Sequence, residues 1–452
     1  MFLLNKKKIQ EGIIGNELLI SFLLIFLGII FQIIRNPFPL IEPFLYAEDA
    51  GWTVMILNYG LGFALENGRP EYPIHLPIYL NYIAISLNTF LHGDNVKFLP
   101  LFSAFMAYGF YAFNALLTFK VVYLATKQKI PAFLSFISFL AIPLAENNTT
   151  IGLNLQWGHL VMYTATLYLL IRSYKGFNLF DGFFYSVCCF SNPVSVLVAP
   201  IIFFFEFVKS NGLNFSFEKI ANFLRERKDW LVIIATFLIC VIYLAFRIDT
   251  GSNTSGSTDS IDWRHFVEFA FYRTFLFHLS ASAIALFDNQ ITILLILILY
   301  LVPLFLNKRL IQNHQLLVIL CCLIAYLLAF SVTRGGITKI LGFKDIFIHF
   351  YWLTLSGFSI ALLAILWSRF KLIYALLVFS QIYFNQNLIF QKTANPPHLG
   401  WYPMIVESYE KSCGDIKCES EATDWFFIRS NPDPYAKIHL SRRIVEATVN
   451  DE

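Results

Sequence analysis

The stretch LLISFLLIFLGIIFQII, from Leu18 to Ile34, decides the fold class of this chain. It contains no charged residue, and Glu17 and Arg35 mark its two ends. A helix needs about 20 mainly apolar residues to cross the roughly 30 Å of hydrocarbon in a bilayer. The stretch therefore predicts a membrane-spanning helix, and the run from Leu231 to Phe246 predicts another.

The composition extends this interpretation to the whole chain. Of its 452 residues, 57% are hydrophobic and only 14% carry a charge, whereas about a quarter are charged in soluble domains. The mean hydropathy is +0.62. We therefore expect an all-α polytopic membrane protein with roughly 10 to 13 transmembrane helices, in contact with membrane lipids. The net charge of +3 is too small to favour nucleic acid as a partner.

Basic residues predict how the chain is threaded through the membrane. The run Lys6–Lys8 precedes the first span and places the N-terminus inside, because cytoplasmic loops are enriched in lysine and arginine. The first outer loop is then 36–75. The predicted transmembrane domain covers 1–390, and a small polar segment, 391–452, follows it on the outer side.

The next basic pair, Lys127 and Lys129, conflicts with the simplest count of spans. If both lysines are cytoplasmic, the apolar segments between the first outer loop and this pair contain one crossing too many. Either Trp52–Leu65 or Leu76–Leu91 is then unusual, or the two lysines violate the rule. The first of these segments has 14 residues and suits an interfacial helix better than a span.

Four later segments also depart from simple spans. Phe180–Val208 is too long for one crossing and is interrupted by Ser191-Asn192-Pro193, which predicts two half-spans that meet at the break. Lys209–Lys228 has periodic apolar residues among basic ones and predicts a cytoplasmic surface helix. Asp262–Phe287 carries several charges and predicts an interfacial or re-entrant helix, and Thr333–Asp345 is expected to be an outer loop.

Two adjacent carboxylates, Glu48 and Asp49, follow the first span within the stretch PFLYAEDAGW, residues 43–52. Ionisable groups at a membrane are costly, and for that reason they are functional candidates. A carboxylate on the outer face could take a proton from an acceptor hydroxyl. The alternative is a helix N-cap, because an apolar helical stretch begins directly after the pair. Capping does not require two adjacent acids, which favours function.

Other polar residues gather in the predicted outer loops and could bind a substrate. Cations neutralise phosphate, while amides and rings hold a sugar by hydrogen bonds and stacking. The candidates are Arg69, His75, Asn154, Gln156, Trp157, His159, Arg334, Lys339 and Lys344. Structural alternatives exist for all of them: an interfacial anchor for Arg69, a position at a span entrance for His75, and an aromatic interfacial belt around Trp157. For the last three cations the alternative is an error in the predicted topology.

The layout of the chain resembles the GT-C superfamily of membrane glycosyltransferases. The resemblance lies in the long multi-span chain, the first outer loop with Ala47-Glu48-Asp49-Ala50-Gly51, the interfacial helix after it and the polar outer tail. The resemblance implies a polyprenyl-phosphate-sugar donor, inversion at the anomeric carbon and an acidic catalytic base in the first outer loop. By position that base is Asp49 or Glu48. The acceptor would be a hydroxyl of a glycan or lipid-linked glycan. No Trp-Trp-Asp signature is present, which argues against transfer of a whole oligosaccharide to asparagine.

Two other functions stay open. A flippase or transporter of lipid-linked glycans would need charged residues along a path through the membrane, and most predicted spans have none. A polysaccharide polymerase or ligase would use a large arginine-rich outer loop, whereas Asp249–His265 is mostly Ser, Thr and Gly. We expect a transferase in the bacterial inner membrane, with its site facing the periplasm or exterior.

The sequence contains no convincing metal site. It has no His-Glu-x-x-His or Cys-x-x-Cys pattern, and two adjacent acids alone hold a divalent cation weakly. A divalent cation is thus the single cofactor to be considered. Five of the seven cysteines lie in apolar segments, and the other two, Cys413 and Cys418, could form a disulfide if the tail is extracytoplasmic.

Overall fold

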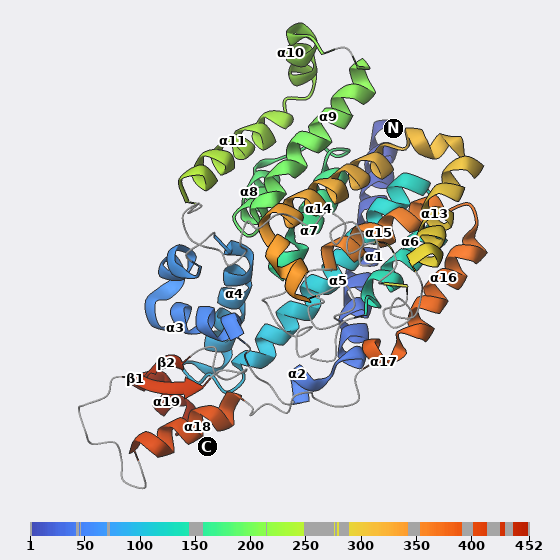
Figure 1. Ribbon diagram of the computed structural model, residues 1–452. Helices are drawn as coiled ribbons and strands as arrows, with labels where there is room; N and C mark the ends of the chain where they lie inside the picture. Colours follow the sequence, from blue (N-terminus) through green and yellow to red (C-terminus); the bar gives the residue numbers. More distant parts are fainter. Residues whose placement is uncertain are drawn as a thin grey trace.

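The computed structural model describes residues 2–41, 45, 47–69, 73–143, 157–213, 215–247, 275, 278–279, 289–341, 353–390, 401–413, 425–429 and 437–450. Helices that run side by side make up most of it (Figure 1). The bundle consists of α1 (Phe2–Arg35), α5 (Leu99–Thr126), α6 (Lys129–Leu140), α7 (Trp157–Arg172), α8 (Leu179–Cys189), α9 (Val198–Asn211), α11 (Trp230–Arg247), α13 (Asn289–Leu306), α14 (His314–Leu341), α15 (Leu353–Leu366) and α16 (Lys371–Phe384). The predicted helical class is confirmed.

The remaining elements join or flank these helices. They are α2 (Phe38–Ile41), α3 (Ala47–Asn67), α4 (His75–His92), the 3₁₀ helices η3 (Pro193–Leu197) and η6 (Lys308–Gln312), α10 (Phe217–Glu226), α17 (Gln386–Ile389), α18 (Trp401–Cys413), β1 (Trp425–Arg429), β2 (Lys437–Ser441) and α19 (Arg442–Val449). The strands pair antiparallel, with Phe427 opposite His439. This hairpin is an exception to the all-helical prediction.

Four helical segments in the described part of the chain are long and apolar enough to cross a membrane: Glu17–Arg35, Leu99–Thr126, Pro193–Asn211 and Trp230–Arg247. Shorter apolar helices accompany them, among them α6, α14, α15 and α16. Neither α3 nor α4 belongs to either group. The membrane class is thereby supported, while the total of roughly 10 to 13 spans stays a prediction.

Close approaches and polar pairs hold the bundle together. A Cβ added at Gly28 of α1 would lie 2.7 Å from the Cβ of Ala112 in α5, so the two helices touch at this glycine. Deeper in the bundle, the hydroxyls of Thr118 and Tyr163 are 2.7 Å apart. Gly357 of α15 packs against the Tyr163 ring. Small residues and hydrogen bonds between helices are the usual means of packing where lipid replaces water.

Side-chain contacts define two ends of the bundle. At one end, Lys175 Nζ lies 3.2 Å from Glu17 Oε2, Lys129 lines the same groove as both residues, and Lys209 Nζ lies 5.1 Å from the centroid of the Tyr174 ring. We call this the lysine end. At the other end, the buried guanidinium of Arg35 donates a hydrogen bond to the carbonyl oxygen of Leu140, 2.7 Å away, and so ties the end of α1 to the end of α6. The α3–α4 hairpin lies toward that second end, which we call the hairpin end (Figure 1).

The predicted break at Ser191-Asn192-Pro193 is confirmed. Helix α8 ends at Cys189, and the chain turns and continues as η3 and then α9. The Asn192 side chain accepts a hydrogen bond from the amide of Val194 and caps η3. Helix α10 is also found, as an element separate from α9, and the Ser216 hydroxyl accepts from the Lys219 amide at its start. Its predicted position on the cytoplasmic surface stays a prediction.

The C-terminal elements pack against α3 and the link between α4 and α5 (Figure 1). The indole nitrogen of Trp401 donates to the carbonyl oxygen of Val96 at 3.0 Å, and the Val96 amide donates to the Thr448 hydroxyl at 3.1 Å. Asn58 in α3 donates to the carbonyl oxygen of His439 in β2. The middle of α3 and the segment after α4 thus contact the same C-terminal elements, while the course of the chain across the membrane stays a prediction.

Candidate functional site

The acidic pair predicted as the catalytic centre lies at the start of α3. The structure places the backbone of Glu48 and Asp49 in the first turn of this helix, while their side chains are outside the described part. A carboxylate near a helix N-terminus is stabilised by the helix dipole. This position is compatible with a structural role and with catalysis, so it does not decide between them.

A bend in α3 brings its two ends together. Gly60 has φ +85° and ψ 171°, a conformation that is almost restricted to glycine, and the helix changes direction there. The indole nitrogen of Trp52, one turn after Glu48, donates to the carbonyl oxygen of Gly68 at 2.8 Å. Arg69 follows Gly68 directly. The bend therefore carries the predicted phosphate ligand back toward the turn that holds the acidic pair.

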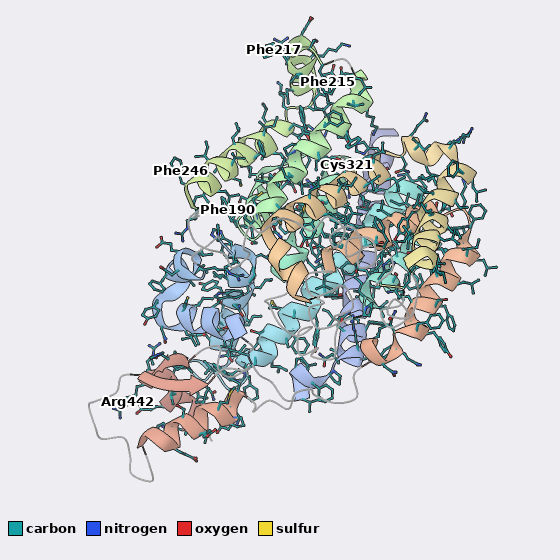
Figure 2. The ribbon with its side chains drawn as sticks, viewed as in Figure 1. Phe190, Phe215, Phe217, Phe246, Cys321 and Arg442 are labelled. Atoms are coloured by element: carbon teal, nitrogen blue, oxygen red, sulfur yellow. The ribbon has the colours of Figure 1, made fainter. Side chains whose placement is uncertain are left out.

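The next candidate, His75, begins α4 and rests on the break after α8. Its backbone amide donates to the carbonyl oxygen of Phe190 at 3.2 Å, and its ring meets the Phe190 ring edge-on at 5.2 Å between centroids. The Leu76 amide donates to the Ser191 hydroxyl at 2.6 Å. Figure 2 shows Phe190 in the region where α8, α11 and α4 approach one another. The break thus supplies acceptors for the free amides at the start of α4.

Arg247, the last residue of α11, completes this region. Its guanidinium donates a hydrogen bond to the carbonyl oxygen of Glu66, near the end of α3. Burial, together with the nearby Arg247 charge, lowers the pKa of His75 to about 4. At neutral pH His75 is therefore uncharged and can act as a hydrogen-bond partner, and the positive charges here belong to arginine.

Arg247 was not among the predicted site residues. The signal that could have revealed it is its position, because it follows the apolar run Leu231–Phe246 at the end expected to face outside. An arginine at that end is unusual, because lysine and arginine are enriched in cytoplasmic loops. Its guanidinium therefore needs a hydrogen-bond partner within the protein. In the structure, one partner is the carbonyl group of Glu66, which no sequence pattern indicates.

The other predicted binding residues are not brought into this region by described contacts. Asn154, Gln156 and Lys344 lie outside the described residues. Trp157 and His159 stand in the first turn of α7, and the structure does not describe their side chains. Because α4 packs against α7, this turn lies on a helix next to the hairpin.

The prediction of an outer loop at Thr333–Asp345 is wrong for its first part. Helix α14 continues to Leu341, so Arg334 and Lys339 are on a helix, although their side chains are outside the described part. Each glycine costs about 1 kcal/mol in a helix interior relative to alanine, yet α14, which packs against α9 and α15, continues through Gly335-Gly336. Tertiary packing therefore outweighs local propensity in this helix. The predicted disulfide also stays untested, because Cys413 ends α18 with an undescribed side chain and Cys418 lies outside the described residues.

Among the side chains that the structure describes, no group of three His, Cys, Asp or Glu could hold a metal ion. The acidic pair is not part of that set, since its carboxylates are outside the described part.

Comparisons with known proteins do not identify a family for this chain. No protein-family model matches the chain, and a search of curated proteins finds no match. Among solved structures, the chain is similar to the oligosaccharyltransferase of Archaeoglobus fulgidus, crystallised in complex with zinc and sulfate, with 13% identity and a TM-score of 0.43. The match covers 86% of this chain and 55% of the other, so this chain spans about half the length of that protein. With a similarity this limited, the function of the chain has to be argued from its own residues.

Proposed function

We propose that this chain is an integral membrane glycosyltransferase that moves a sugar from a polyprenyl-phosphate donor to a hydroxyl of a glycan or lipid-linked glycan on the extracytoplasmic face. The observation that carries the proposal is the bend in α3. Through the hydrogen bond between Trp52 and Gly68, it joins the turn that bears two carboxylates to the segment that bears Arg69. A base and a cation then face one substrate site.

The proposed reaction needs one base and at least one cation. Asp49, with Glu48 as its neighbour or replacement, takes the proton of the acceptor hydroxyl. The acceptor oxygen attacks the anomeric carbon as the bond from that carbon to the phosphate oxygen breaks, with inversion. Arg69 and Arg247 neutralise the charge that develops on the phosphate. His75 is neutral at pH 7 and contributes a hydrogen bond rather than a charge.

A divalent cation would have a clear role in this reaction if the acidic pair bound it. A hard cation held by carboxylate oxygens would share the phosphate charge with the two arginines. The chain offers Glu48 and Asp49 for this purpose, and the remaining ligands would come from the donor phosphate and water. Transfer measured with and without a chelator, at constant ionic strength, tests this part of the proposal.

The experiment that tests the proposal compares three carboxylate variants of the full-length protein. Purified protein in lipid is supplied with a panel of polyprenyl-phosphate sugars and glycan acceptors, and the released polyprenyl phosphate is measured. Asp49→Asn should lower transfer about 100-fold or more, the usual contribution of a general base. Glu218→Gln is the matched control, because Glu218 is an exposed glutamate in the first turn of another helix, α10. It should retain transfer.

The same assay separates the two acids and the alternative functions. Asp49→Asn with full transfer would remove Asp49 from the role of base, and Glu48→Gln with reduced transfer would then assign the role to Glu48. A flippase would move the lipid across liposomes without cleaving its bond to the sugar. Within the described bundle, several buried polar side chains pair with one another, as in the 2.6 Å hydrogen bond from Thr164 to Asn114.

A further inference from the structure

A groove of about 670 Å³ lies at the lysine end of the bundle, far along α1 and α5 from the proposed catalytic site. Its wall on α1 is made by Glu17, Ile20, Ser21 and Leu24. This spacing places the four residues on one face of the helix. Ile20 is 51% exposed, so the groove is open along this side. Its volume falls within the range of about 300–1,000 Å³ that is typical of ligand pockets.

The facing wall is apolar except for one lysine. Helix α5 contributes Leu116, Phe119, Lys120 and Tyr123, again at helical spacing. Lys120 stands about 9 Å from the end of α5, at 1.5 Å per residue, and so lies inside the groove rather than at its mouth. Within the described part of the chain, Lys120 makes no hydrogen bond and no ion pair. The acid that attracts the Lys120 ammonium is Glu17, which is already paired with Lys175. A half-buried ammonium without a hydrogen-bonded carboxylate of its own therefore points to an anionic ligand.

The charges at the groove mouth reinforce this interpretation. Lys129 of α6 and Lys175 after α7 also line it, against one acid, Glu17. Three positive charges and one negative charge leave a net charge of +2. The one acid is already engaged, because Glu17 lies 3.2 Å from Lys175. Charge complementarity therefore favours a ligand with an anionic group.

The apolar residues of the groove walls indicate that the ligand also has an apolar part. Leu24, Leu116 and Phe133 line the groove beneath the charged rim. Phe133 is 45% exposed, so the apolar surface continues to the outside of the bundle. Glu17–Arg35 and α5 are both long and apolar enough to cross a membrane, and the opening between them would face lipid. A soluble phosphate would leave this apolar surface uncovered, whereas an acyl chain would cover it.

We propose that the groove binds an anionic phospholipid from the membrane leaflet at the lysine end. The phosphate lies against Lys120 and Lys175, and one acyl chain lies between α1 and α6 on Ile20 and Phe133. Basic pockets between transmembrane helices bind such head groups through the charges of lysine and arginine. This binding goes beyond the proposed transferase activity, and its test does not depend on it.

The test is native mass spectrometry of the full-length protein in detergent, titrated with phosphatidylglycerol or with phosphatidylcholine of the same acyl chains. Phosphatidylglycerol should bind about tenfold more tightly, a difference of about 1.4 kcal/mol. Lys120→Gln should weaken phosphatidylglycerol binding about fivefold, in line with about 1 kcal/mol per lysine at an anionic lipid. Lys371→Gln is the matched control, because Lys371 is an exposed lysine at the start of α16 that does not line the groove.

A second pair of variants tests the apolar part and keeps the charges. Ile20→Trp fills the groove and should abolish the bound lipid, while Leu23→Trp alters another exposed position of the same helix and should not. Should Lys120→Gln fail to fold, this pair alone decides the question. Equal binding of both lipids, an unchanged affinity in Lys120→Gln or Ile20→Trp, or full competition by soluble glycerol phosphate would overturn the proposal.

Discussion

The indole nitrogen of Trp52 lies 2.8 Å from the carbonyl oxygen of Gly68 and donates a hydrogen bond that closes the bent helix α3 on itself. Trp52 is almost fully buried, so this bond is made in the core that α3 and α4 share with the C-terminal elements. The contact fixes the distance between the turn with the acidic pair and the segment that begins at Arg69. The geometry of the proposed site depends on this bond.

Replacement of Trp52 by phenylalanine tests that dependence. Trp52→Phe removes the bond and should lower stability by about 1 kcal/mol, the usual net value of one hydrogen bond. It should also reduce sugar transfer by more than the loss of folded protein explains. Trp401→Phe is the control, because Trp401 is equally buried in the same cluster and also donates to a backbone carbonyl, that of Val96. Equal transfer rates in the two variants, at equal folded fractions, would contradict the role given to Trp52.

The pH dependence of stability should reveal His75. In the folded protein its pKa is about 4, against 6.5 when unperturbed, so the unfolded chain takes up the proton first as the pH falls. The neutral His75 ring contributes its full stabilisation above pH 6.5. This contribution is lost as the pH falls from 6.5 to about 4. At about 1.4 kcal/mol per unit, the loss is roughly 3 kcal/mol. Thermal unfolding in detergent at a series of pH values measures it, and His75→Phe should flatten this part of the profile. An unchanged profile in the variant would assign the loss to other groups.

The bend in α3 depends on a backbone conformation that only glycine adopts readily. Gly60→Ala should destabilise the protein by about 1–3 kcal/mol, because φ is +85° there although the space around it is empty. Gly62→Ala is the control two residues away, with an equally open surrounding and no positive φ. It should be neutral or stabilising by up to about 1 kcal/mol. The two melting temperatures, measured in the same detergent, test this, and a neutral Gly60→Ala would show that α3 can be continuous.

The contact between α1 and α5 should also be sensitive to a single added methyl group. Gly28→Ala places a Cβ 2.7 Å from the Cβ of Ala112, so the helices have to separate, at a cost of about 1–3 kcal/mol. Gly109→Ala in α5 adds the same methyl group to open space and should not destabilise the bundle. Thermal unfolding of both variants measures the difference. Similar stabilities would mean that the two helices are not held at this distance.

The sequence predicts individual apolar helices because hydrophobic length is a local property. The run Leu18–Ile34 predicts the second half of α1, and Ser191-Asn192-Pro193 predicts the end of α8, because proline and an apolar run each act on their own segment. Thr333–Asp345 is expected to be an outer loop, whereas α14 continues as a helix to Leu341.

The site is less predictable because it depends on contacts between distant segments. The acidic pair is visible in the sequence as a departure from an apolar background, and so is Arg69. The hydrogen bond from Arg247 to Glu66 joins residues that are 181 positions apart, and no local sequence pattern predicts it. The neutral state of His75 likewise follows from burial against Phe190 and from the Arg247 charge, neither of which is a property of its neighbours in sequence.

The contact between Asn58 and His439 spans 381 positions of the chain. At about 5–20 residues per second, a ribosome needs roughly 20 to 75 s to make the second partner after the first. During that time α3 has emerged without the strand against which it packs. The region of the proposed site is therefore completed only after β2 has been made, and a chain arrested before β2 would carry the acidic pair without this support.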